Sequence, residues 1–137
     1  MKPSLLKKLN LIIEEANVLK NKNKFQKAID KFEQALNFIN IKVDELSDKK
    51  IEIANIRNAI NQTYSVEINN IIQESIRLTA QKEYNQARTN FQTALKICDK
   101  IDDEDLKEAE KSEINEIDAD FKIDDSDMLP TNDDDEE

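Results

Sequence analysis

The chain has 137 residues, enough for one ordinary domain or two very small ones, and its formal net charge at pH 7 is −10. It contains neither Gly nor His, which excludes Gly-rich nucleotide-binding loops and removes the commonest general base and metal ligand. No apolar run approaches the roughly 20 residues that a membrane span needs, and the N-terminus lacks the pattern of a signal peptide. We therefore expect a cytoplasmic protein without an integral membrane segment.

The first predicted element is a helical hairpin over residues 4–41. Apolar residues recur at helical spacing from Leu5 to Leu19, and Ser4 stands where an N-cap would be. Short polar residues at 21–24 interrupt this pattern, and a second amphipathic stretch then runs from Phe25. Because the turn is short, we expect the two helices to fold back antiparallel.

The middle of the chain, residues 43–82, contains neither Gly nor Pro and keeps an apolar stripe at spacings of three, four and seven. One long helix is one interpretation, and a break between Asn61 and Ser65 is the alternative. In either case a connecting helix over residues 43–65 leads into a second hairpin over residues 66–100.

A last and weaker amphipathic helix is predicted over residues 104–118, where it would cap the second hairpin. Charge separates this end from the rest, because residues 1–101 hold 17 Lys and Arg against 12 Asp and Glu, whereas residues 102–137 hold 3 against 18. Residues 122–137 are too acidic and too poor in apolar side chains to fold alone, so they are predicted to be a disordered tail. The predicted domain therefore spans residues 4–121. It is all-α, with two antiparallel hairpins joined by a long helix.

The two hairpins repeat each other at a shift of 59 residues. The matches fall on core-facing positions, as a duplicated packing unit requires. The matched pairs are Ile12 and Ile71, Leu19 and Leu78, Phe25 and Tyr84, Ala28 and Ala87, Phe32 and Phe91, Ala35 and Ala94, and Leu36 and Leu95.

This pattern resembles the tetratricopeptide repeat (TPR), whose hairpins carry a series of small, large, aromatic, Ala, Phe and Ala residues. The resemblance covers about residues 9–41 and 68–100, roughly half the chain. The sequence departs from the family at the helix-ending Pro, which is Asn40 in one copy and Asp99 in the other. The copies are also 59 residues apart, not 34. The residues that carry the resemblance are Ala16, Leu19, Phe25, Ala28, Phe32 and Ala35, and then Ser75, Leu78, Tyr84, Ala87, Phe91 and Ala94.

The extra residues between the copies leave a second interpretation open. They either lengthen the first helix of the second repeat or add a third helix to the first unit. A third helix would make residues 4–64 resemble the microtubule-interacting and trafficking (MIT) domain, a three-helix bundle, with residues 66–121 as a degenerate second copy. That resemblance implies recognition of helices from membrane-remodelling filament proteins. A helical hairpin or coiled coil unrelated to either family is the remaining interpretation.

No catalytic, metal or cofactor site is predicted. Ser-His and Cys-His arrangements cannot be built without His. Cys98 takes the repeat position of Ile39 and is interpreted as a small core residue. The lysines around residues 20–31 form a basic turn, but almost no Arg and no aromatic platform accompany them, so we do not expect nucleic-acid binding. We expect a protein that is not an enzyme and has no cofactor.

The TPR resemblance implies that the first helix of each hairpin lines a concave face that binds a peptide. Polar amides there could bond a peptide backbone, and the isoleucines could accept an apolar side chain. Glu14 stands where some members of the family place an Asn that clamps a chaperone's C-terminal carboxylate, so no such clamp is expected. The predicted partner-binding groove comprises Asn10, Glu14, Asn17, Lys20, Asn21, Asn69, Ile72, Gln73 and Ile76.

The predicted function is therefore a protein–protein interaction module that binds a protein or peptide partner. Because two repeats bury little surface, the chain is also expected to use a cap, a homodimer or a larger complex. A self-associating assembly subunit is one alternative function. The acidic tail adds a further hypothesis, in which it folds back over the basic body and screens the groove.

Overall fold

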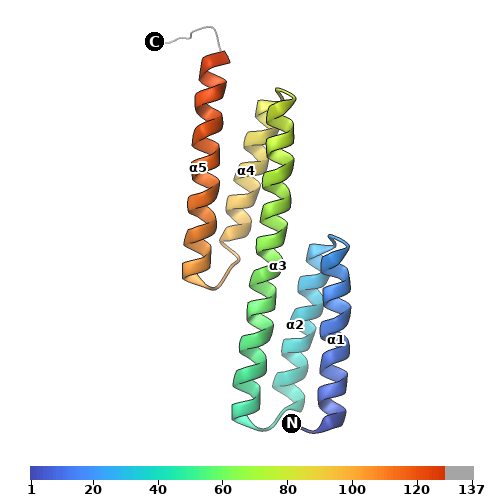
Figure 1. Ribbon diagram of the computed structural model, residues 1–137. Helices are drawn as coiled ribbons and strands as arrows, with labels where there is room; N and C mark the ends of the chain where they lie inside the picture. The colour runs from blue at the N-terminus through green and yellow to red at the C-terminus, as the bar shows by residue number, and fades with distance from the viewer. Residues whose placement is uncertain (129–137) are drawn as a thin grey trace. The chain divides into compact units, whose positions relative to one another are not determined.

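The computed structural model describes the backbone of residues 1–128 and the side chains of residues 1–119, and this part of the chain consists of α-helices joined by short turns (Figure 1). The all-α prediction is confirmed, with no strand within the described residues. None of the described helices is long and apolar enough to cross a membrane. The helices are α1 (Pro3–Asn21), α2 (Phe25–Lys42), α3 (Leu46–Ala80), α4 (Tyr84–Cys98) and α5 (Glu104–Met128).

The chain divides into two compact units, which meet in sequence between Glu67 and Ile68. Helix α3 passes through this boundary without a break, so of the two interpretations of the sequence the single long helix is correct and the alternative break between Asn61 and Ser65 does not occur. The polar residues there are compatible with a helix, since the Thr63 hydroxyl donates a 2.8 Å hydrogen bond to the Ala59 carbonyl one turn earlier. Each unit therefore contains two complete helices and one part of α3.

The first unit is a three-helix arrangement of α1, α2 and residues 46–67 of α3. Its core cluster draws on all three helices and includes Leu9 and Ala16 from α1, Phe32 from α2 and Ile56 from α3. Each of these side chains is at most 1% exposed. The segment predicted to connect the hairpins is thus also the third packed helix of this unit.

The second unit combines residues 68–80 of α3 with α4 and α5. Its buried side chains include Ile68 and Ser75 on α3, Phe91 on α4 and Ile114 on α5. An ion pair of 2.7 Å joins Lys111 on α5 to the Asp99 carboxylate at the end of α4. Helix α5 therefore packs as a third helix here, as residues 46–67 do in the first unit.

The turns inside the two hairpins have the same hydrogen bonds at a shift of 59 residues. Asn23 and Lys82 both adopt the left-handed conformation, with φ of 62° and 66°. The next amide, of Lys24 or Glu83, donates back to the carbonyl of Leu19 or Leu78 at 2.9 and 2.8 Å. This is the Schellman arrangement that ends many helices, usually with Gly at the left-handed position. Because the chain has no Gly, Asn and Lys occupy it instead.

The ends of two helices differ from the sequence-based expectation. Ser4 is not the N-cap of α1: Lys2 takes that place and Pro3 is the first helical residue, where its missing amide hydrogen is not needed. Helix α5 is longer than the predicted 104–118 and is described as far as Met128. Of the predicted acidic tail, residues 129–137 lie outside the described part of the chain.

Candidate interaction surface

The five predicted groove residues of the first unit all lie on α1. Asn10, Glu14, Asn17 and Asn21 are exposed, and Lys20 is half-buried. The helical spacing of the buried Leu9 and Ala16 places Asn10, Glu14, Asn17 and Asn21 away from the centre of the core, whereas Lys20, one turn after Ala16, lies at the edge of the buried face. Four of the five side chains are therefore exposed to solvent on α1.

The four predicted groove residues of the second unit lie on α3, and one of them is buried. Asn69, Gln73 and Ile76 are exposed, whereas Ile72 is only 4% exposed. Ile72 was expected to accept a partner's side chain, and this expectation is wrong. It lies one turn from both Ile68 and Ser75 and shares their buried face, so it belongs to the core of the unit.

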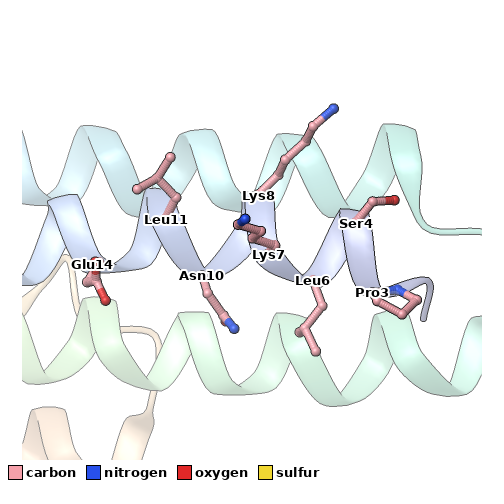
Figure 2. A pocket seen from close by; sticks show the side chains of 8 residues that line it. All are labelled: Pro3, Ser4, Leu6, Lys7, Lys8, Asn10, Leu11 and Glu14. Carbon is pink, nitrogen blue, oxygen red and sulfur yellow. The ribbon is translucent and has the colours of Figure 1, made fainter.

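Sequence reasoning missed an apolar surface on the outer side of α1. Leu6, Leu11 and Val18 are 39%, 57% and 49% exposed, and Pro3 beside them is exposed too. A hollow of about 750 Å³ runs along the first turns of this helix (Figure 2). It is lined by Pro3, Ser4, Leu6, Lys7, Lys8, Asn10, Leu11 and Glu14. The signal was present in the sequence, because Leu11 and Val18 are seven residues apart on the face opposite Ala16.

We refer to Pro3, Leu6, Lys7, Lys8 and Leu11 as the α1 strip. Figure 2 shows its side chains on neighbouring turns, with Leu6 and Asn10 on one side of the helix and Lys8 and Leu11 on the other. Both lysines are exposed, and neither forms an ion pair within the described residues. The strip is therefore apolar and positively charged.

The second unit shows that the fold does not require an apolar strip. Six of the seven exposed large apolar residues in the described part of the chain belong to the first unit. At the shift of 59, Leu6, Leu11, Val18 and Ile41 correspond to Ser65, Asn70, Arg77 and Lys100. Asn70, Arg77 and Lys100 are polar residues of the second unit, whereas Ser65 lies on the part of α3 that belongs to the first unit.

The second unit has a hollow of different character, between α3 and α4. It measures about 400 Å³ and is lined mainly by polar residues, namely Glu74, Leu78, Asn85, Gln86, Thr89 and Asn90. The Arg77 guanidinium donates hydrogen bonds to the Glu74 carboxylate at its edge, which holds the pKa of that carboxyl below its ordinary value. The Glu74 carboxylate that lines this hollow is therefore already hydrogen-bonded within the second unit.

The reactive groups of the described residues show no arrangement of catalytic type. Cys98 is buried, and burial raises the pKa of its thiol to about 11, so the nucleophilic thiolate is scarce at neutral pH. Within the described part, no group of three His, Cys, Asp or Glu side chains is placed to hold a metal ion. The α1 strip is therefore the surface feature that most needs an explanation.

Comparisons of the chain with protein-family models, with curated proteins and with solved structures found no match.

Proposed function

We propose that this chain is a non-enzymatic protein–protein interaction module, a TPR-like adaptor or scaffold of the cytoplasm. Its first unit binds a peptide or helix of a partner protein along α1, and nucleic acid is not its ligand. The observation that carries the proposal is the set of exposed apolar residues on α1, because Leu11 and Val18 correspond to the polar Asn70 and Arg77 in the second unit.

Single exposed apolar residues are common on proteins, but a contiguous apolar patch rimmed by polar groups marks an interaction site. Leu11 and Val18 are exposed two turns apart on one face of α1, and Leu6 is exposed on the other side of the helix (Figure 2), with Lys7, Asn10 and Glu14 beside them in the hollow. The rim residues Asn10 and Glu14 also belong to the face that the sequence predicted for binding.

The test compares substitutions at equivalent positions of the two copies. Leu11→Ser with Val18→Ser removes the two most exposed large apolar groups of α1, and Asn70→Ser with Arg77→Ser alters the corresponding positions of α3. All four side chains are exposed, so each pair should leave stability within about 0.5 kcal/mol per substitution. A partner captured from the native source and identified should lose at least tenfold in affinity for the α1 variant and little for the α3 variant. Equal binding by both variants would contradict the proposal.

A second candidate is an MIT-like domain that recognises helices of membrane-remodelling filament proteins. The division into two units of three helices each supports it, since the unit boundary after Glu67 is close to the end of the three-helix bundle that this resemblance implies. Synthetic amphipathic helices from such filament proteins should then bind the whole chain. Their failure to bind, together with a captured partner of another kind, would favour the adaptor.

A measurement of mass in solution distinguishes a self-associating assembly subunit from a monomeric binding module. The chain has a mass of 15.9 kDa, so a solution mass near this value across the accessible concentration range would count against self-association. A multiple of this value without any added ligand, lost in the α1 variant, would instead assign the strip to contacts between copies.

A further inference from the structure

One side of α1 carries a row of exposed residues spaced seven apart. Leu11 and Val18 are 57% and 49% exposed, and Ser4, seven positions before Leu11, is exposed as well. A spacing of seven residues keeps side chains on one side of a helix, and coiled coils use this spacing to pack one helix against another. Figure 2 shows Ser4 and Leu11 on the same side of α1 and Leu6 on the other, so Leu6 is not part of this row.

Charged residues flank the row in a fixed order, two lysines and then two glutamates. Lys7 and Lys8 come about one turn before Leu11, Glu14 and Glu15 come about one turn after it, and all four charged side chains are exposed. Because Lys7 and Glu14 are seven residues apart, they lie on one flank of the row, and Lys8 and Glu15 lie on the other. Opposite charges pair within a helix at spacings of three or four, so neither pair forms within α1. We call the whole set the outer face of α1, namely Ser4, Lys7, Lys8, Leu11, Glu14, Glu15 and Val18.

The order of charges on this face is complementary to itself when two copies of α1 run antiparallel. A two-fold axis through Leu11 places each flank of one helix against the same flank of the other and reverses its direction. Lys7 of one copy then lies opposite Glu14 of the second copy. Lys8 likewise lies opposite Glu15 of the second copy, and symmetry repeats both pairs. Opposite charges therefore surround two contacting leucines, which is the complementarity that fixes direction and register in an interface.

A parallel pair of the same helices lacks this complementarity. Each flank would then meet the opposite flank at the same level, so Lys7 of one copy would lie opposite Lys8 of the second copy. The second unit does not present the row either, because Asn70 and Arg77 stand where the first unit has its two apolar residues. The self-complementary surface is therefore specific to the first unit and to the antiparallel direction.

We propose that the outer face of α1 binds the same face of a second copy of this chain, antiparallel and centred on Leu11. The face covers about four turns of one helix. This is less surface than the roughly 1,600 Å² that a standard stable interface buries, so the pairing is weak and depends on concentration. The pairing does not rest on the proposed function. A partner that also binds α1 competes with the second copy, because both use the same side chains.

Sedimentation of the full chain at increasing concentration measures the pairing, and reversal of charge on each half of the face tests its register. The mass should rise from 15.9 kDa toward twice that value. Lys7→Glu with Lys8→Glu leaves only acids around Leu11, and Glu14→Lys with Glu15→Lys leaves only lysines. Each of these variants alone should dissociate with a constant at least tenfold higher than that of the native chain.

Mixing the two charge-reversed variants should restore the pairing, since every acid of one then faces a lysine of the other. One chain with all four substitutions should restore it too, because the order of charges is reversed and the complementarity is kept. As a matched control, Lys96→Glu with Lys100→Glu makes the same charge change on exposed lysines of the second unit and should leave the pairing unchanged. Circular dichroism verifies that each variant folds.

The two-fold axis also predicts which position forms a disulfide with its own copy. In Leu11→Cys the two new thiols face each other at the axis, so mild oxidation should link two chains. In Val18→Cys the two new thiols lie about 20 Å apart along the helices, beyond the reach of a disulfide. This variant should cross-link at least tenfold more slowly. The native Cys98 is buried in both.

Three results would overturn the proposal: the mass of one chain at every concentration, no recovery when the two charge-reversed variants are mixed, or equal rates of cross-linking for Leu11→Cys and Val18→Cys. The affinity of a captured partner for Leu11→Ser with Val18→Ser is a separate measurement. The proposed function can therefore fail while the pairing holds, and the pairing can fail while a partner still binds α1.

Discussion

The first and second units share several fully buried positions, yet they present different surfaces to solvent. Leu9 and Ile68, Ala16 and Ser75, and Ile39 and Cys98 are each 0% exposed at the shift of 59. Outside the core, leucines on one copy stand where serine and asparagine stand on the other. The packing pattern therefore constrains which residues are buried and leaves the exposed residues free to differ. A surface difference between the copies therefore points to a role other than folding.

The third helices of the units extend this comparison beyond the hairpins. They correspond at a shift of 58, because Val43 and Ile101, and then Ile56 and Ile114, are buried pairs at that spacing. The helices also begin at that spacing, at Leu46 and Glu104. The repeat is thus a unit of three helices, with one residue fewer in the second copy before its third helix. The sequence offered this unit only as a second interpretation, with residues 66–121 as a degenerate copy, because the apolar pattern of α5 is sparse and the register slips by one residue.

The largest expected effect comes from the two buried rings. Phe32→Ala and Phe91→Ala should each lower the free energy of unfolding by about 3–5 kcal/mol, because both side chains are almost wholly buried between small residues. If the copies are packed alike, the two losses should agree within about 1 kcal/mol in urea titrations. The milder Phe→Leu substitutions serve where an Ala variant does not fold. A loss at one site several times that at the other would break the equivalence.

The buried thiol gives a chemical probe of the second unit alone. With its pKa raised from 9.0 to about 11, Cys98 should be alkylated roughly 100-fold more slowly at pH 8 than an exposed thiol, before any steric protection is counted. Its protonated form is favoured by folding, so this contribution to stability is complete below pH 9 and is lost as the pH rises to about 11. Alkylation rates of native and urea-unfolded chain check this. Equal rates would mean that the second unit opens readily.

A smaller effect is expected at the two turn residues with a positive φ, where substitution by Gly should stabilise the two hairpins to different extents. Lys82→Gly should stabilise the chain by about 0.5–1 kcal/mol, because Gly removes the steric cost of a positive φ. The higher conformational entropy of Gly in the unfolded chain offsets part of this gain. Asn23→Gly should gain less, because Asn tolerates this conformation better than Lys. Thermal or urea unfolding of both variants measures the difference. A larger gain at Asn23 would contradict the shared turn geometry.

The smallest expected effect concerns the ion pair between Lys111 and Asp99 in the second unit, which has no equivalent at the matching positions of the first unit. The hydrogen bond from Lys111 holds the pKa of Asp99 below its ordinary value, so the pair stabilises the unit above pH 3.8 and is lost as the pH falls through the lowered value. The equivalent residues of the first unit are Ile53 and Asn40, which do not titrate. Amide exchange should therefore rise in α5 on acidification, and less so in Asp99→Asn. An unchanged acid response in that variant would assign the effect to other carboxylates.

Much of the fold could be predicted because its signals are local. The spacing of Ala28, Phe32 and Ala35 predicts both the helix and its buried face, and short polar runs predict the turns. The candidate site was predicted only in part. Asn10 and Glu14 were correctly predicted to be exposed on α1, whereas Leu11 lies outside the face that the TPR resemblance implies and was not part of the predicted groove.

The helices, the hairpin turns and the duplication follow from the amino-acid sequence alone, because periodicity, turn chemistry and repeated residue types act between neighbours in the chain. Which face of each helix is covered by another helix depends on the packing of the whole unit. Ile72 became core and Leu11 stayed exposed, although both are apolar residues on amphipathic helices. Burial depends on side chains far away in sequence, and a helical pattern specifies a face without specifying what covers it.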